Sequence, residues 1–318
     1  MNEFRKFIEL SRILGQRPDF VQGAGGNVSI KIDSQKMLIK ASGWRLSDID
    51  ENNGLVKVDY NEIKNNNNFI FEKSWNLRPS IETGFHAFLD KFVIHTHSVY
   101  ANIIACAVNG KLLWKEISKD FDFGAIWVGY SSPGENLALA VKKSVNNYKN
   151  KHLKMPEAIL MQNHGLIVSG DNLDRVFELH NKIQEIIKTR LNLGNNFPEI
   201  KISETNGGFK SQTRYLKDFI LNNYFLIENF SKNILFPDQA VFCNSIGEKI
   251  LINEAAGDIF YKASQKEALT IEENLTAWAY IVDCAENCGL DLNFISQEDI
   301  DYIKNMESEK YRKELLKK

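Results

Sequence analysis

Three of the six histidines in this chain lie in two short apolar segments, at a spacing suited to binding a metal ion. His95 and His97 flank Thr96 at the end of a predicted strand over residues 92–97. Alternate strand residues point to the same side, with Cα atoms about 7 Å apart, so both imidazoles can reach a common point. His164 stands between two further predicted strands. Three neutral imidazoles around one open position form the ligand set of a catalytic zinc-type site.

Glu82 adds a carboxylate thirteen residues before His95, at the start of a predicted helix over residues 83–89. An acidic residue in the first turn of a helix is common, because the helix dipole favours negative charge there. Beside a divalent cation, Glu82 could instead be a fourth ligand or a base. His86 lies on the same helical face four residues later, and we interpret it as a structural residue.

The glycine-rich segment from Gly23 to Asn27 superficially suggests a dinucleotide-binding loop. Such a loop requires a strand before it and a helix after it. Here a predicted helix over residues 2–15 precedes the segment and a predicted strand over residues 28–32 follows it, so we reject that interpretation. The glycines can still expose backbone N–H groups to an anion, and Asn27 adds a side-chain amide. A plain turn remains the alternative.

The composition narrows the class of protein. A chain of 318 residues can bury a sizeable core and form two units. The formal net charge of -2 argues against a general nucleic-acid or anionic-membrane binder, although it permits a phosphorylated substrate. No apolar run approaches the roughly 20 residues that span a bilayer. Four cysteines without paired metal or redox spacing, and no signal-peptide pattern, predict a cytoplasmic location.

Short strands and helices follow each other without a regular βαβ series, which predicts an α/β protein with mostly antiparallel strands. Strands are predicted at 28–32, 36–40, 53–59, 92–97, 125–128, 158–161 and 165–168, and helices at 2–15, 83–89, 98–107, 135–148 and 172–193. A candidate linker at 194–212 precedes a helix at 213–231, strands near 240–242 and 249–252, and helices at about 270–288 and 297–316. The charged residues 307–318 are interpreted as a solvated helical face.

These motifs, taken in order, resemble those of the class II aldolase/adducin family, and most closely its fuculose-1-phosphate aldolase members. The ordered set is much more specific than any single motif. The matching elements are Gly26-Asn27-Val28-Ser29, Ser42-Gly43, Pro79-Ser80-Ile81-Glu82, His95-Thr96-His97, Tyr130 with Pro133-Gly134, and Gln162-Asn163-His164-Gly165-Leu166.

The resemblance implies a three-layer α/β/α sandwich around a mostly antiparallel central sheet. Residues 1–205 would form this metal-dependent catalytic domain, and residues 206–318 a small α+β extension of unknown role, without a counterpart in simple aldolases of this type. The segment 236–239 faintly resembles part of some longer relatives. The resemblance also implies a homo-oligomer, usually a fourfold tetramer.

Site residues are implied position by position. The metal ligands would be His95, His97, His164 and Glu82, with Glu82 also the catalytic acid/base and Tyr130 a proton donor to the aldehyde-derived oxygen. The substrate phosphate would be bound by Gly26, Asn27, Ser42, Gly43 and Ser80. The family commonly has a second small hydroxyl residue before the glutamate. Ile81 stands there and offers only its backbone N–H, which weakens or alters phosphate recognition.

The implied reaction is reversible aldol cleavage of a ketose 1-phosphate to dihydroxyacetone phosphate and an aldehyde, through an enediolate stabilised by a divalent ion. Zn²⁺ is the expected ion, while Mn²⁺, Co²⁺ or Fe²⁺ also suit imidazole and carboxylate ligands. A decarboxylase of sugar acids or their phosphates, an epimerase, and a non-catalytic adducin-like binding module remain alternatives. A glutamate at position 82 favours aldol or decarboxylation chemistry, because the related epimerases tend to have aspartate there.

Overall fold

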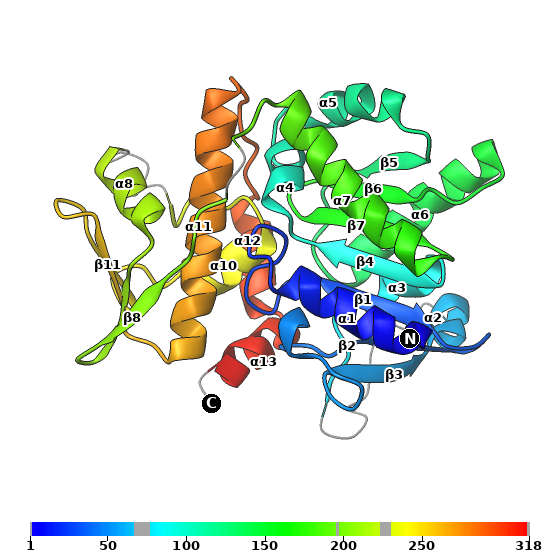
Figure 1. The fold of residues 1–318 in the computed structure, drawn as a ribbon, viewed down its shortest axis with the longest axis horizontal. Coiled ribbons are helices and arrows are strands. Elements are labelled where there is room, and N and C mark those ends of the chain that lie inside the picture. The colour runs from blue at the N-terminus through cyan, green and yellow to red at the C-terminus, as the bar shows by residue number, and fades with distance from the viewer. Residues whose placement is uncertain (1, 67–76, 195–196, 223–229, 317–318) are drawn as a thin grey trace.

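The computed structural model of the chain describes residues 2–66, 77–194, 197–222 and 230–316. A central sheet has the strand order β3-β2-β1-β4-β7-β6-β5, and its neighbouring strands are antiparallel except β5 and β6, which are parallel. The strands are β1 Asn27–Lys31, β2 Lys36–Lys40, β3 Leu55–Asp59, β4 Phe92–Thr96, β5 Ala125–Val128, β6 Ala158–Met161 and β7 Gly165–Gly170. This mostly antiparallel sheet confirms the fold class expected from the sequence (Figure 1).

Helices cover both faces of the central sheet because its strands are apolar on both faces. Phe92 and Ile94 of β4 join one apolar cluster with side chains of α1 (Glu3–Gly15), α4 (Val99–Ala105) and α7 (Leu173–Arg190). Val93, between them, joins a second cluster with α3 (Thr83–Phe88) and α6 (Glu135–His152). Successive strand residues face opposite sides, and each buried apolar side chain contributes about 1.5–3 kcal/mol relative to exposure. Two short helices, α2 (Tyr60–Asn66) and α5 (Gly110–Ile117), complete this part.

Strand register brings the sequence motifs together at one end of the sheet. Asn27 at the start of β1 pairs with His95 on β4, and Thr96 on β4 pairs with Leu166 on β7. Gly26 has a φ of +57°, and a Cβ there would lie 2.7 Å from the carbonyl oxygen of His95. This close approach requires glycine. The glycine-rich segment therefore lies directly against the histidine strand.

The C-terminal part adds a second sheet of order β10-β11-β9-β8 and several helices. Its elements are β8 Ile202–Thr205, β9 Gly208–Ser211, α8 Arg214–Asn222, α10 Pro237–Phe242, β10 Ile250–Asn253, β11 Asp258–Tyr261, α11 Gln265–Asn287, α12 Gln297–Asn305 and α13 Glu307–Leu316. Figure 1 shows α11 standing between the two sheets. Leu275 and Trp278 of α11 belong to the same apolar cluster as Phe92 and Ile94, so one continuous core joins the C-terminal part to the central sheet.

Three sequence-based expectations for this region were wrong in part. Residues 240–242 are helical in α10 and not a strand, because Pro237 and the acidic Asp238 favour a helix start there and a short apolar run does not distinguish the two. The candidate linker contains the β8–β9 hairpin, whose turn uses Gly207 at φ +91°; residues 195–196 lie outside the described residues. The predicted helix 297–316 is interrupted at Met306.

Two other expectations can be compared with the described residues only. The helix predicted at 213–231 is α8 up to Asn222, and residues 223–229 lie outside the described residues. Within the part of the chain that the structure describes, no helix combines the length and apolar character that crossing a bilayer requires. The cytoplasmic location stays a prediction.

The turn that carries His164 is fastened to the C-terminal part through Asn163. This buried residue has a φ of 52°, a left-handed conformation that asparagine tolerates. Its side-chain Nδ2 donates to the carbonyl oxygens of Leu235, at 2.9 Å, and Asn293, at 2.8 Å. Its Oδ1 accepts from Asn293 Nδ2 at 3.0 Å. The position of His164 thus depends on contacts that are 72 and 130 residues distant in sequence.

We predict that Asn163→Ala lowers the free energy of unfolding by about 1–3 kcal/mol, because two buried carbonyl oxygens lose their donor. Urea unfolding of the metal-free protein measures this change. Asn192→Ala is the matched control, since Asn192 is exposed and has a similar φ of 50°. Equal losses in both variants would mean that only the backbone conformation matters.

Candidate metal centre

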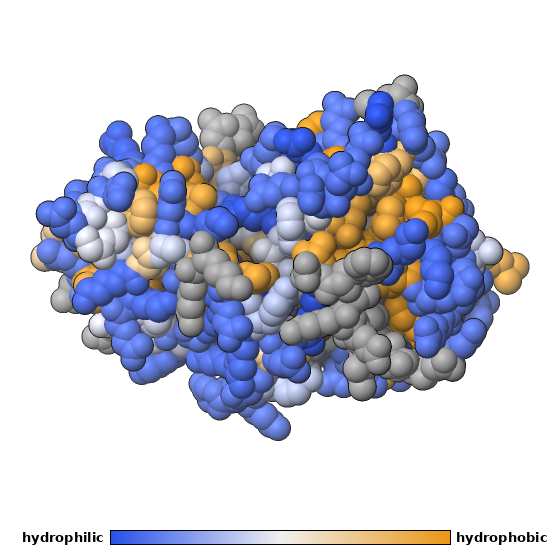
Figure 2. All heavy atoms as spheres, turned by 90° about the horizontal axis from the view of Figure 1, so that it is seen from below, coloured by the Kyte–Doolittle hydropathy of each residue, from blue (hydrophilic) through white to orange (hydrophobic). Residues whose placement is uncertain are grey.

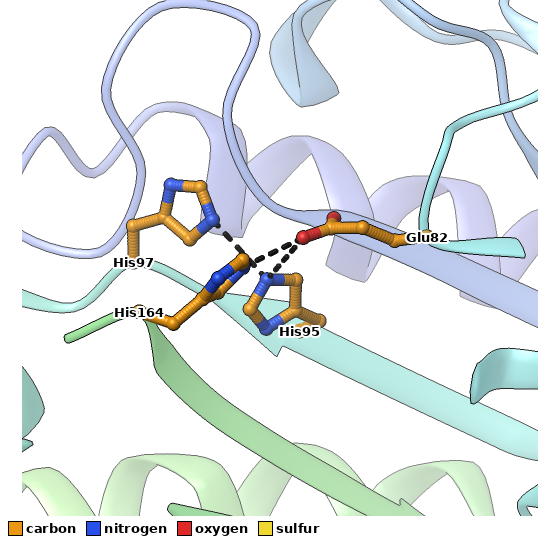
Figure 3. A group of neighbouring side chains, drawn as sticks. All are labelled: Glu82, His95, His97 and His164. Atoms are coloured by element: carbon orange, nitrogen blue, oxygen red, sulfur yellow. Dashed lines mark hydrogen bonds and ion pairs between the residues drawn. The ribbon is translucent and has the colours of Figure 1, made fainter. Parts of the chain in front are cut away.

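Four buried side chains converge at the end of β4. The ligand atoms of Glu82, His95, His97 and His164 all lie within 4.8 Å of one another (Figure 3). His95 is on β4 and His97 directly follows it, His164 is in the turn between β6 and β7, and Glu82 immediately precedes α3. The structure thus brings together the four residues that the sequence analysis singled out as ligands. A buried cluster of this composition could bind a metal ion.

The hydrogen bonds of the imidazoles fix which nitrogen faces the centre. His95 Nδ1 lies 3.1 Å from the carbonyl oxygen of Leu166, and His97 Nδ1 lies 3.1 Å from Asp238 Oδ2. Both partners only accept, so each Nδ1 donates to its partner and each ring turns its Nε2 toward the centre. These two Nε2 atoms are 3.2 Å apart. Two ring nitrogens at that distance repel unless a proton or a metal ion lies between them.

The four donor atoms are close enough together to share one divalent ion. In a tetrahedral site two nitrogens at 2.0–2.1 Å from the ion would be about 3.4 Å apart, and the donor atoms of this cluster lie within 4.8 Å of one another. Glu82 Oε1 is 2.7 Å from His164 Nε2 and 3.4 Å from His95 Nε2. This carboxylate oxygen is therefore a fourth donor atom beside the three imidazoles. Three imidazole nitrogens and one carboxylate oxygen are donors that suit zinc and related first-row metals. The residues present therefore fit the metal that the sequence led us to expect.

The carboxylate of Glu82 is held by both of its oxygens. Burial raises the pKa of this carboxyl, but the imidazoles of His95 and His164 outweigh burial and hold its pKa well below its usual range. Its second oxygen, Oε2, accepts a hydrogen bond from Asn27 Nδ2. Asn27 Nδ2 also donates to Ser80 Oγ at 3.2 Å. The glycine-rich segment therefore orients the carboxylate as well as lying beside it.

The C-terminal part supplies a residue that the sequence analysis missed. Asp238, 1% exposed, accepts from His97 through Oδ2 and pairs with Arg312 Nη1 through Oδ1 at 2.9 Å. Burial raises the pKa of Asp238, but Arg312 and then His97 outweigh it and hold the pKa below its usual range. A carboxylate that fixes the orientation of a metal-ligating histidine strengthens metal binding. The only signal in the sequence was the faint resemblance at residues 236–239.

A cavity beside the cluster gathers the residues predicted to bind phosphate. It is lined by Glu82, His97 and His164, by the predicted phosphate-site residues Gly26, Asn27, Ser42, Gly43 and Ser80, and by Lys40, Asp238, Glu309 and Arg312 among others. Lys40 Nζ donates to the carbonyl oxygens of Ala24, at 2.8 Å, and Trp44, at 2.7 Å. Burial, and next the positive charge of Arg312, lower the pKa of Lys40 to about 7.

Helix α13 contradicts the interpretation of residues 307–318 as a solvated face. Glu309 is 4% exposed, and the Arg312 side chain is 12% exposed. Both line the cavity, whereas Lys310 and Glu314 between and beyond them are exposed. The sequence of a charged helix does not show which of its side chains will be buried in an ion pair. Neither the charge of a residue nor its position in the helical repeat identifies the partner it will have in the fold.

Tyr130 is not among the residues that line the cavity. It is half-buried after β5 and packs against the larger apolar cluster. Burial and the neighbouring carboxylate of Asp299, on α12, raise its pKa. Its role as a proton donor stays a prediction. His86 also lies outside the cluster: its Nδ1 is 2.7 Å from Ser29 Oγ, and burial lowers its pKa to about 3.

We predict that Asp238→Asn weakens Zn²⁺ binding about 10–100-fold, because an amide does not fix the tautomer and orientation of His97 as a carboxylate does. Competition with a chromophoric chelator measures the affinity. Asp258→Asn is the control: Asp258 pairs with Lys210 on the second sheet and does not line the cavity. Wild-type affinity in Asp238→Asn would contradict the positioning role.

Comparison with solved structures finds similar chains at low identity. The N-terminal class II aldolase domain of a conserved protein from Thermoplasma acidophilum is 25% identical, with a TM-score of 0.48, over 60% of this chain and 94% of that one. An L-fuculose 1-phosphate aldolase is 22% identical, with a TM-score of 0.44, over 61% and 90%. A sugar-phosphate aldolase from Thermotoga maritima is 16% identical, with a TM-score of 0.46, over 60% and 96%.

The comparison with curated proteins gives no match. The sequence model of the class II aldolase and adducin N-terminal domain matches residues 5–191, which is more than half of the chain. The matched range holds the central sheet and all four residues of the buried cluster. By this match the chain belongs to the class II aldolase and adducin family.

Proposed function

We propose that this protein is a metal-dependent lyase that catalyses the reversible aldol cleavage of a ketose 1-phosphate to dihydroxyacetone phosphate and an aldehyde. One observation carries the proposal: the ionised carboxylate of Glu82 lies among three imidazoles, at the edge of a cavity whose lining includes serine, asparagine and glycine residues. A base beside a cation site and an anion-binding cavity is the arrangement that enediolate chemistry requires.

Each residue of the buried cluster has its own proposed role. His95, His97 and His164 would hold the divalent ion, for which we propose Zn²⁺. When bound, such an ion supplies positive charge that stabilises the enediolate left by carbon–carbon cleavage. Glu82 transfers the proton at the enediolate carbon, and Asn27 holds the other carboxylate oxygen so that the reacting oxygen keeps its direction.

The phosphate of the substrate would lie in the cavity beside the cluster. There the proposed contacts are backbone N–H groups of the glycine segments and the side chains of a small group of polar residues, namely Asn27, Ser42 and Ser80. Ile81 lines the same cavity and adds no hydroxyl. The proposed role of Tyr130 rests on the sequence resemblance alone.

We also propose a homo-oligomer, with the fourfold tetramer as the expected form. Figure 2 shows apolar side chains gathered on the central-sheet half of the face seen from below, while the half belonging to the second sheet is more hydrophilic. Contiguous apolar surface of this kind is typical of areas that another chain covers. Sedimentation of the purified protein measures the assembly.

A substrate screen tests the reaction. The zinc-loaded protein is incubated with ketose 1-phosphates and, separately, with sugar acids and their phosphates. We expect dihydroxyacetone phosphate from a ketose 1-phosphate, detected by a coupled reduction with glycerol-3-phosphate dehydrogenase. Release of carbon dioxide from a sugar acid would instead establish the decarboxylase, because both reactions leave an enediolate. Absence of stoichiometric metal would favour an adducin-like binding module.

We predict that Glu82→Gln retains bound zinc but slows solvent deuterium exchange at the enediolate carbon of dihydroxyacetone phosphate by about 100-fold or more, since an amide does not accept the proton. Mass spectrometry follows the exchange and elemental analysis the zinc. His95→Ala is the contrasting variant, which should lose zinc and exchange together. Wild-type exchange in Glu82→Gln would exclude Glu82 as the base.

A further inference from the structure

Arg312 of α13 keeps an unused hydrogen-bond donor inside the proposed active site. Its Nη1 pairs with Asp238 Oδ1 at 2.9 Å and with Glu309 Oε2 at 2.8 Å. Its Nη2 is buried and has no hydrogen-bond partner among the residues that the structure describes. A buried unpartnered donor costs about 1–3 kcal/mol. Such a group is uncommon in a folded protein and indicates a partner that the chain itself does not supply, which is a water molecule or a bound anion.

The guanidinium is held firmly in place. Besides its two carboxylate contacts, its central carbon lies 5.1 Å from the centre of the Phe242 ring. An arginine has five N–H donors, so the bonds made through Nη1 leave capacity for a further anion. Arg312 is thus oriented before any substrate binds.

Helix α13 sits directly on the segment proposed to bind phosphate. Gly43 has a φ of +79°, and a Cβ there would lie 2.4 Å from Leu315 Cδ1 of α13. Arg312 lines the same cavity as Ser42, Ser80 and Lys40. A second cation and several neutral donors therefore surround the place where the phosphate is proposed to bind.

The other side chains of the cavity leave room for a stronger contact. Ile81 lines the cavity and offers no side-chain donor. A guanidinium makes a stronger contact than a hydroxyl or an amide, because charge-assisted hydrogen bonds to phosphate are roughly twice as strong as neutral ones. Ile81 and Arg312 line the same cavity.

We propose that Arg312 is a substrate-contacting residue that binds the phosphate group of the substrate through Nη2, so that the C-terminal helix α13 completes the recognition site within the same chain. This proposal rests on the function proposed above. It assigns the C-terminal part a direct task in substrate selection: it favours phosphorylated over unphosphorylated substrates.

The cavity is narrow. The part of it that a water-sized group can occupy measures about 30 Å³, which is room for one or two water molecules. The α13 side of the wall is fastened by the Arg312 ion pairs and by a hydrogen bond from Ser264 Oγ to Leu316 O at 2.6 Å. A neighbouring groove of about 720 Å³ shares Ile81 with the cavity and is bordered by Met306, where α12 and α13 meet.

The test uses 2-phosphoglycolate and glycolate, which differ by the phosphate, titrated calorimetrically into the zinc-loaded full chain. We expect Arg312→Gln to weaken 2-phosphoglycolate binding about 10–100-fold and to leave glycolate binding unchanged. Arg312→Lys keeps the charge without the planar fork, so its affinity should fall between the two. Lys310→Gln, on the exposed side of the same helix, should bind both ligands like wild type.

Three outcomes would overturn the proposal. Unchanged 2-phosphoglycolate binding in Arg312→Gln would show that Nη2 makes no contact with phosphate. Equal weakening of both ligands would show that Arg312 acts only through Asp238 and the metal ligands, and zinc content measured in parallel would detect that effect. If wild-type protein does not prefer 2-phosphoglycolate, the phosphate site of the proposed function fails together with this proposal, whereas a preference that Arg312→Gln retains overturns this proposal alone.

Amide hydrogen exchange gives a second readout that a purely structural role would not change. We expect 2-phosphoglycolate to slow exchange in residues 307–316 of the wild type, and glycolate to leave it unchanged. In Arg312→Gln neither ligand should protect the helix. Protection of α13 in that variant would contradict a phosphate contact through Arg312.

Discussion

The Nε2 atoms of His95 and His97 face each other 3.2 Å apart in a buried site, and this contact needs a proton or a metal ion between them. The surrounding structure holds both rings so that the two nitrogens stay in contact. A strand carbonyl takes the hydrogen of His95 Nδ1 and a buried carboxylate takes that of His97 Nδ1, so neither ring can turn its protonated nitrogen inward without losing a partner. The demand for positive charge is therefore a property of the folded chain itself.

The central sheet makes this arrangement stiff. Its strands are buried on both faces, so a one-residue slip of β4 would turn Ile94 and Val93 to the wrong clusters and carry His95 away from the site. The same register sets Asn27 opposite His95, and from there Asn27 reaches Glu82. Core packing and site geometry are thus fixed by one set of strand pairings, and a mutation in either disturbs the other.

The C-terminal part is integrated with the candidate metal centre. It shares a continuous core with the central sheet, fastens the His164 turn through Asn163, and places Asp238 behind His97. Buried charges in this region come in linked groups, because an isolated buried ion costs several kcal/mol. Asp238, Arg312 and Glu309 form such a group beside the cavity. The residues that surround the site therefore come from both ends of the chain.

The sequence by itself predicted many of the local elements and the four residues of the buried cluster. Short continuous apolar runs located β4, β6 and β7, and histidines at alternate strand positions had to share a side, which is a consequence of strand geometry alone. The order of the motifs indicated the family and hence the sheet. Tertiary structure decided the rest: that residues 240–242 form a helix, that residues 202–211 form a hairpin, and that Asp238 and Arg312 reach the site. Those contacts join residues that are far apart in the chain. The sequence around a charged residue does not show whether packing will bury its side chain beside a partner or leave it in water.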